Sequence, residues 1–355
     1  MRQSTPGGSV PLDPRALLRD MAAYAKPHTG RSLFELVVTA VPFLLLLGMM
    51  GWGVSSGFWL SLVLTIPAGG FLLRLFLIQH DCGHGSFFRK RAANDWVGRA
   101  IGVLTMTPYD YWKRTHAVHH ARTGNLDSRG VGDVNTLTVE EYRSRPLWRR
   151  IFYRLYRHPA ILFGVGPAYV FLIQHRLPIG VMRGGWRVWV SAMATNAAIA
   201  GIAALSIWQF GAMTLLLVYL PTFLLAATAG VWLFYVQHQF EDAHWERDEE
   251  WSFHEAALHG SSHLDLPAVL RWFTANIGIH HIHHLSSRIP SYRLSEVLRD
   301  RPELRDVKRL TLWQSFKMVP LALWDEERRK LVSFRQAKAL ALARRGSVAA
   351  ADGRG

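Results

Sequence analysis

Three short segments of the chain are rich in histidine, and their spacings repeat. The first reads H-x-x-x-H, whereas the second and the third both read H-x-x-H-H. Residues three or four apart share one face of a helix, so the imidazoles of each segment are expected to point to the same side. The eight histidines are His80 and His84, then His116, His119 and His120, and then His280, His283 and His284.

Imidazole groups gathered in this way are ligands for iron, zinc, copper or nickel. Eight ligands exceed the four or so that one tetrahedral ion takes, so the number favours two metal ions in one centre. His238 is a ninth candidate ligand, because it ends an apolar stretch as His80 does. Asp81 could orient a ligand imidazole from the second shell. Asn276, one helical turn before His280, could hold a metal-bound water.

The other histidines and the cysteine receive simpler interpretations. His281 points away from the shared face of its segment. With Cys82 as the only cysteine, neither an intrachain disulfide nor a thiolate metal site is possible, and we expect Cys82 to be a packing residue. The remaining histidines are expected to be structural or exposed, namely His28, His158, His175, His244, His254, His259 and His263.

Two uncharged stretches are the elements that must position these histidines. Half of the residues are hydrophobic, and 36–73 and 188–240 contain no charged residue. One span needs roughly 20 residues, so each stretch is long enough for two spans joined by a tight turn. We therefore expect an all-α integral membrane protein with four transmembrane helices in two hairpins, at about 33–52, 57–79, 188–207 and 212–236.

The distribution of charge predicts the orientation. The net charge is +15, and apart from Arg74, near the end of the second expected span, the lysines and arginines lie outside the two expected hairpins. By the positive-inside rule both termini and the central connection are cytoplasmic, so all three histidine segments fall on one face, where a helical cap holds the di-metal site. We expect a bacterial inner-membrane protein. The basic charge suits anionic lipid headgroups better than nucleic acid, because no nucleic-acid-binding motif accompanies it.

The flanking regions are polar. Residues 1–32 form a cytoplasmic segment without a signal peptide, with a short helix that starts at Asp13-Pro14 and ends before Pro27. The connection after the first hairpin contains an expected interfacial helix at Trp96–Met106. It also contains an apolar run at 160–174. We interpret this run as a re-entrant or interfacial segment, and the alternative is a transmembrane span. The expected catalytic domain is 33–320. Residues 321–355 are expected to form a basic amphipathic helix from Trp324 and a disordered tail from 345.

The order of these motifs resembles the membrane fatty acid desaturases. The chain reads H-D-C-G-H-G-S-F-F from His80, H-A-V-H-H from His116, Q-H at His238, and H-H-I-H-H-L-x-x-R-I-P-x-Y from His280. The three-residue gap in the first box is similar to the gap in the bacterial acyl-lipid desaturases, a branch that includes omega-6 or delta-12 enzymes. The flanking segments that share the resemblance are Gly124–Asp127, Arg129–Asp133 and Thr138–Tyr142.

The resemblance implies a non-haem centre of two iron ions held by the eight box histidines and His238. It implies a reaction that uses O2 and external electrons to place a cis double bond in the acyl chain of a membrane lipid. The sequence contains no flavin, haem or cysteine-cluster motif, so a carrier such as ferredoxin would deliver the electrons. The acyl chain would enter an apolar tunnel between the spans, with Trp112 as a candidate wall residue.

Two alternatives remain open from the sequence. A hydroxylase or ketolase of the same superfamily would use the same histidines but deliver oxygen to the substrate. A non-catalytic membrane zinc protein is less favoured, because a transporter would need ionisable residues within its spans and these spans contain almost none.

Overall fold

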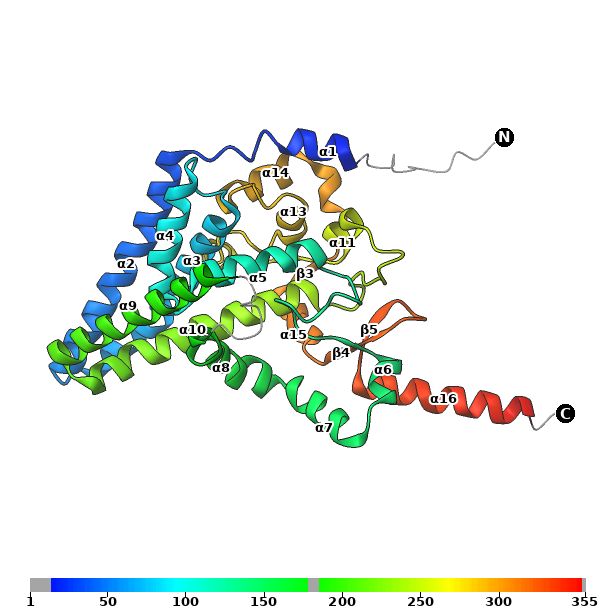
Figure 1. Cartoon of the computed structure of the whole chain (residues 1–355). Helices are drawn as coiled ribbons and strands as arrows, with labels where there is room; N and C mark the ends of the chain where they lie inside the picture. Colours follow the sequence, from blue (N-terminus) through cyan, green and yellow to red (C-terminus); the bar gives the residue numbers. More distant parts are fainter. Residues whose placement is uncertain (1–13, 178–184, 353–355) are drawn as a thin grey trace.

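The computed structural model describes residues 14–177 and 185–352 of the chain. Most of these residues are helical, and the long helices lie together at one end of the molecule (Figure 1). Asp13 lies outside the described residues, and helix α1 (Pro14–Met21) begins at the next residue. The predominance of helix agrees with the expected fold class.

Four helical segments of the described chain are long and apolar enough to cross a membrane, and each coincides with one expected span. Helix α3 packs against both α2 and α10, and α9 packs against α10. Helix α10 continues through Pro221, as expected of a membrane helix. The segments are α2 (Thr29–Ser55), the 3-10 helix η1 (Trp59–Leu64) continued by α3 (Thr65–His84), α9 (Trp186–Phe210) and α10 (Ala212–His238).

The outer surface of these helices is apolar. On α2, Leu33, Phe34 and Val37 are each about half exposed, and Val41 and Leu44 extend the same face along the helix. A continuous apolar face of this size is unfavourable in water, whereas lipid acyl chains would cover it. The surface is therefore consistent with membrane association.

A buried ion pair joins α2 to α3 inside this apolar layer. Glu35 pairs with Arg74, and Arg74 Nε also donates to Thr39 Oγ1 at 3.1 Å. Glu35 is only 4% exposed and Arg74 only 5%. A charge that is removed from water is stable only when a partner compensates for the lost hydration, so each of these side chains depends on the other.

The connections between the long helices contain shorter helices. Helix α4 (Arg91–Leu104) begins earlier than the helix expected at Trp96–Met106 and packs against α3 and α5 (Tyr109–Arg122). The apolar run at 160–174 forms a π-helical turn, η2 (Ile161–Val165), and then α8 (Gly166–Leu172), which pack against α10. Other short helices are α6 (Val139–Ser144), α7 (Leu147–Tyr156), η3 (Gln174–Arg176), α11 (Phe253–His259), α12 (Ala268–Phe273), α13 (His280–Leu285), η5 (Ser291–Arg293), α14 (Leu294–Asp300), η6 (Pro302–Arg305) and α15 (Leu312–Met318).

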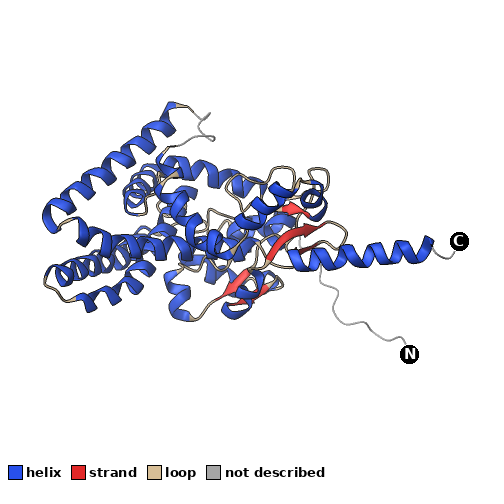
Figure 2. Cartoon of the chain, turned by 90° about the horizontal axis from the view of Figure 1, so that it is seen from below, coloured by secondary structure: helices blue, strands red, loops and turns tan. Residues whose placement is uncertain are grey.

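Short strands form two small sheets, which occupy a minor part of the molecule (Figure 2). In the first sheet β4 (Leu321–Asp325) lies between β1 (Leu137–Thr138), which runs parallel to it, and β5 (Lys330–Ser333), which runs antiparallel. In the second sheet β2 (His263–Asp265) pairs in parallel with β3 (Arg309–Thr311). The second sheet adjoins the segment before the third histidine box, through a bridge between His263 and Ile279.

Two expectations for the C-terminal region are wrong. The basic helix expected from Trp324 begins only at Phe334, as α16 (Phe334–Asp352), because Trp324 and Leu331 are buried in the β4–β5 hairpin. The expected disorder from residue 345 is contradicted as well, since α16 continues to Asp352. Residues 353–355 lie outside the described part of the chain.

The buried ion pair leads to a stability prediction. Replacing Glu35 by Ala leaves the Arg74 guanidinium buried without its carboxylate, which is expected to destabilise the protein by about 3–5 kcal/mol. Thermal unfolding in detergent would measure this as a clearly lower midpoint. The matched control is Glu249→Ala, which removes an exposed carboxylate and should leave the midpoint nearly unchanged. Equal midpoints for the two variants would contradict the role given to the pair.

Candidate metal centre

The nine candidate ligand histidines lie together in two groups. Within each group every histidine offers one ring nitrogen, and these nitrogens all lie within 4.8 Å of one another. Each group combines histidines from different segments of the chain, and the second and third boxes contribute to both. The first group contains His80, His84, His116, His120 and His283, and the second contains His119, His238, His280 and His284.

The ends of two long helices place three of these rings. His80 and His84 occupy the end of α3, which stops at Gly85 with a positive φ of 68°. Glycine takes this left-handed conformation without strain and so ends the helix directly after His84. His238 is the last residue of α10. Because α3 and α10 pack against each other, their ends bring these rings to the same region.

The second and third boxes lie on shorter helices. Helix α5 carries the second box and packs against α3, and α13 carries the third and has all six residues buried. The chain just before α13 is fixed by β2, where the Leu264 N–H donates to the Gly278 carbonyl at 2.8 Å. A Cβ at Gly278 would lie 2.3 Å from the Leu264 carbonyl oxygen, so this approach requires glycine.

The ring nitrogens face one another at short range. His120 Nε2 lies 3.1 Å from both His116 Nε2 and His283 Nε2. His280 Nε2 lies 2.9 Å from His238 Nε2 and 3.1 Å from His284 Nε2. One ring nitrogen offers either one proton or one lone pair, so it cannot form good hydrogen bonds with two such neighbours at once.

The environment favours the neutral form of four of these rings. Burial lowers the pKa of His116, His120, His283 and His284, and neighbouring histidines lower it further. A neutral imidazole presents a lone pair, which is the form that binds a metal ion. Buried and otherwise unsatisfied, the converging nitrogens fit a metal centre with two ions, one for each group. Their separations of about 3 Å suit ligands that each lie about 2.1 Å from a shared ion.

Asp133 orients a candidate ligand and was not identified from the sequence. Its carboxylate contacts Nδ1 of His119, and Thr123 Oγ1 lies 3.4 Å from each nitrogen of the same ring. Carboxylates commonly fix the orientation and tautomer of metal-binding histidines in this way. Asp133 lies 14 residues beyond His119, too far for helical spacing to connect the two. The only sequence signal was its place in the segment Arg129–Asp133, part of the family resemblance.

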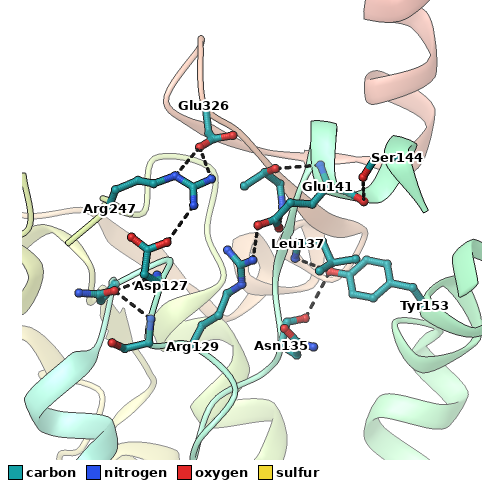
Figure 3. A network of polar contacts seen from close by, with 12 residues as sticks. Asp127, Arg129, Asn135, Leu137, Glu141, Ser144, Tyr153, Arg247 and Glu326 are labelled. Carbon is teal, nitrogen blue, oxygen red and sulfur yellow. Dashed lines mark hydrogen bonds and ion pairs between the residues drawn. The ribbon is translucent and has the colours of Figure 1, made fainter. Parts of the chain in front are cut away.

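The loop that carries Asp133 is held by ion pairs from separate parts of the chain (Figure 3). Arg247 donates to Asp127 Oδ1 at 2.8 Å and to Glu326 Oε1 at 2.8 Å. Further along the loop, Arg129 pairs with Glu141 of α6. Exposed pairs are individually weak, but several charges joined in one network restrict the loop more than isolated pairs do.

Asp81 lies beside the candidate ligand His80, whose Nδ1 has no hydrogen-bond partner within the described residues. Its Oδ1 is 3.5 Å from His80 Nδ1, and its Oδ2 accepts a hydrogen bond from the Ser291 N–H at 2.8 Å. It therefore also ties the end of α3 to the chain that follows α13. His238 has a comparable support in the backbone, because its Nδ1 lies 3.2 Å from the Gly260 carbonyl oxygen.

Asn276 and His281 lie outside both groups. Asn276 Oδ1 accepts a hydrogen bond from Ser295 Oγ at 3.0 Å. His281 is fully buried, with Nε2 placed 2.9 Å from the Leu304 carbonyl oxygen. The face-sharing expected of the third box therefore holds for its other three histidines, with His281 directed elsewhere.

A mainly apolar cavity reaches the histidines. Its volume is about 480 Å³, and its walls come mainly from α3, α8 and α10. His80 and His116 of the first group and His280 of the second line one part of it. Trp112 is also in the wall and stacks on His116, with ring centroids 4.6 Å apart. The structure thus places the expected wall residue between the apolar cavity and a candidate ligand.

The contact with Asp133 can be tested by metal retention. Asp133→Asn removes the charge that orients His119, so metal affinity is expected to fall roughly 10- to 100-fold. Metal content after a graded chelator challenge of the purified protein would measure this. Asp306→Asn changes an exposed carboxylate away from the histidines and should retain metal as the unaltered protein does. Equal retention by both variants would rule out the orienting role.

Comparison with known proteins agrees with this geometry. A model of the family described as Fatty acid desaturase matches residues 57–316. A protein named Fatty acid desaturase from Bacillus subtilis (strain 168) is 44% identical over 324 residues, which cover 91% of this chain and 92% of that protein. An sn-1 oleoyl-lipid 12-desaturase from Synechocystis sp. is 31% identical over 66% of this chain and 67% of its own length.

A second Synechocystis relative, named sn-1 acyl-lipid omega-3 desaturase (ferredoxin), is 30% identical over 75% of this chain and 73% of its own length. The family match includes all nine clustered histidines, which the fold gathers beside an apolar cavity. The chain therefore belongs to the fatty acid desaturase family, a family of oxidoreductases that act on acyl lipids.

Proposed function

We propose that this protein is a di-iron acyl-lipid desaturase that introduces a cis double bond into the acyl chain of a membrane lipid. The observation that carries the proposal is the cavity of about 480 Å³, which is lined mostly by apolar residues and also by histidines of both groups. An acyl chain in this cavity would have one stretch of its carbons next to both metal positions.

The nine clustered histidines are the proposed ligands of two iron ions. The bound ions and O2 together supply the oxidising power to remove hydrogen from an unactivated alkyl chain, which side-chain acids and bases lack. Asp133 and the Gly260 carbonyl hold His119 and His238 in the orientation that directs their free nitrogens inward. Asp81 is the proposed partner of His80.

The chain's own residues position the substrate. Phe76 and Trp112 lie edge to face, with centroids 5.4 Å apart, and both line the cavity next to His80. Farther along, Phe171 and Phe223 continue the aromatic wall. These rings exclude water and confine the chain, so that a fixed pair of carbons faces the histidines. Asn276 Oδ1 instead accepts a hydrogen bond from Ser295 Oγ, so the proposed site does not include Asn276.

The electrons come from outside the chain in this proposal, because the sequence has no flavin, haem or cysteine-cluster motif. One relative carries ferredoxin in its name. Ferredoxin-type carriers are acidic, and the formal net charge of +15 would favour their association electrostatically.

We place the four long helices across the bacterial inner membrane as two hairpins, with both termini cytoplasmic. Supporting this, the histidines lie at the ends of α3 and α10 that face the arginine-rich segments. Residues 33–320 are the proposed catalytic domain, in which the shorter helices cap the metal centre. Residues 1–32 and 321–355 flank this domain.

A delta-12 position is the proposed site of the double bond. The Synechocystis 12-desaturase and the order of the histidine boxes support it, whereas the name of the Bacillus relative specifies no position. Expression in a host without polyunsaturated lipids, followed by fatty acid profiling with localisation of the double bond, is the direct test. A diunsaturated product with its new bond at carbon 12 is expected. A hydroxylated or keto product would overturn the proposal.

Loss of one ligand should abolish the reaction. His283 Nε2 lies 3.1 Å from His120 Nε2 inside the first group, so His283→Ala is expected to remove detectable product. The control is His259→Ala, because His259 is exposed and lies outside both groups. Product from the first variant at the level of the control would contradict the ligand assignment.

Filling the cavity with a larger side chain should impair substrate binding and leave metal binding unchanged. Gly230 lines the cavity, and a Cβ there would meet Leu73 at an ordinary contact distance of 3.5 Å. The Leu side chain of Gly230→Leu would take up space for the acyl chain, so product is expected to fall at least about ten-fold while bound metal is unchanged. Gly201→Leu is the matched control on α9, where nothing lies within 4 Å. Unchanged product from Gly230→Leu would show that the acyl chain lies elsewhere.

A further inference from the structure

A second cavity lies on the opposite side of α3 from the acyl cavity. Its volume of about 190 Å³ has room for about six water molecules at roughly 30 Å³ each. Arg74 and Ile78 line it, whereas Leu72, Phe76 and His80 of the same helix line the larger cavity. At about 100° per residue these two sets face opposite sides of the helix, so the cavities are separate.

The charge of this second cavity is positive. Three guanidinium groups and one carboxylate line it, from Arg31, Arg74, Arg271 and Glu35. Glu35 is shared, because one of its oxygens accepts from Arg31 Nε at 2.6 Å and the other pairs with Arg74. Within residues 14–177 and 185–352 the structure shows no hydrogen bond or ion pair for the Arg271 guanidinium. Three positive groups and one negative group leave a surplus of positive charge, which suits the binding of an anion.

The cavity lies where the apolar layer of the molecule begins. Arg31 is in the first turn of α2, and the half-exposed Leu33 and Phe34 follow directly. On the other rim, α12 carries Val269, which is 67% exposed, beside Arg271. A positively charged cavity is therefore bordered by apolar surface on two sides, an arrangement that matches an anionic head with apolar tails.

We propose that this cavity binds the phosphate of an anionic phospholipid, with the acyl chains of the lipid lying along Phe34 and Val269. Guanidinium groups bind phosphate strongly because their planar N–H donors match two of its oxygens. Trp272 stacks on Arg74, with Cζ 4.1 Å from the ring centroid, and so holds one of the three arginines in place. This lipid is not the substrate, and its binding does not depend on the proposed reaction.

The test is lipid binding to the full chain in neutral detergent. Phosphatidylglycerol or phosphatidylcholine with the same acyl chains is titrated in, and native mass spectrometry counts the bound molecules. The unaltered protein should retain one phosphatidylglycerol at concentrations that leave phosphatidylcholine unbound. Arg271→Gln should weaken this binding roughly ten-fold, the effect of one lost charge-assisted hydrogen bond. Arg271 is exposed, so this variant should unfold at the same temperature as the unaltered protein.

Arg187→Gln is the matched control, because it removes the same charge from the first turn of another long helix, α9, outside the cavity. It should bind phosphatidylglycerol like the unaltered protein. If the Arg271 and Arg187 variants bind phosphatidylglycerol with equal affinity, the proposed site is wrong. This holds whether both bind as strongly as the unaltered protein or both have lost binding. Displacement of the lipid by millimolar inorganic phosphate, without any preference for phosphatidylglycerol, would assign the cavity to free phosphate and also overturn the lipid proposal.

Discussion

The structure depends on nine imidazole groups, six buried and three half-buried, whose nitrogens converge and cannot satisfy one another. His120 Nε2 has two such neighbours at 3.1 Å, and burial lowers the pKa of this ring, so its hydrogen bonding to them is incomplete. Without a cation this arrangement would leave several polar atoms buried and unpaired, at a cost of about 1–3 kcal/mol each. Metal binding would remove that cost, so the stability of this region and its chemistry rest on the same contacts.

Contacts in the rest of the fold hold these rings close together. Two long helices end at the histidines, and their packing against each other limits how far His80 and His238 can move apart. The buried Glu35–Arg74 pair fixes α2 against α3 on the other side. Farther from the membrane layer, the ion pairs of Arg129 and Arg247 restrain the loop that brings Asp133 to His119. Helix packing thus supplies the coarse position, and polar contacts supply the orientation of each ring.

Local patterns were enough to predict the long helices and the candidate ligands. Uncharged stretches of sufficient length allow few structures other than membrane helices, and helical spacing explains why the histidines of each box share a face. Contacts between distant segments have no such local signal. Asp133 meets His119 only because the loop folds back, and Trp324 lies in a strand because β1, far away in the sequence, pairs with β4. The basic, leucine-containing segment 324–340 fits a helix by composition, but strand pairing keeps its first part, up to Ser333, out of the helix that begins at Phe334.

The position of the third box has a consequence for biosynthesis. His120 and His283 belong to the same candidate ligand group but are 163 residues apart, and translation at 5–20 residues per second needs about 10–30 s to cover that interval. During this time the first two boxes are present without the helix that completes and covers the centre. An incomplete histidine site prefers copper and zinc to iron, by the usual order of affinities. Correct metallation of the proposed di-iron centre would therefore depend on the metal pools that the nascent chain meets before α13 closes it.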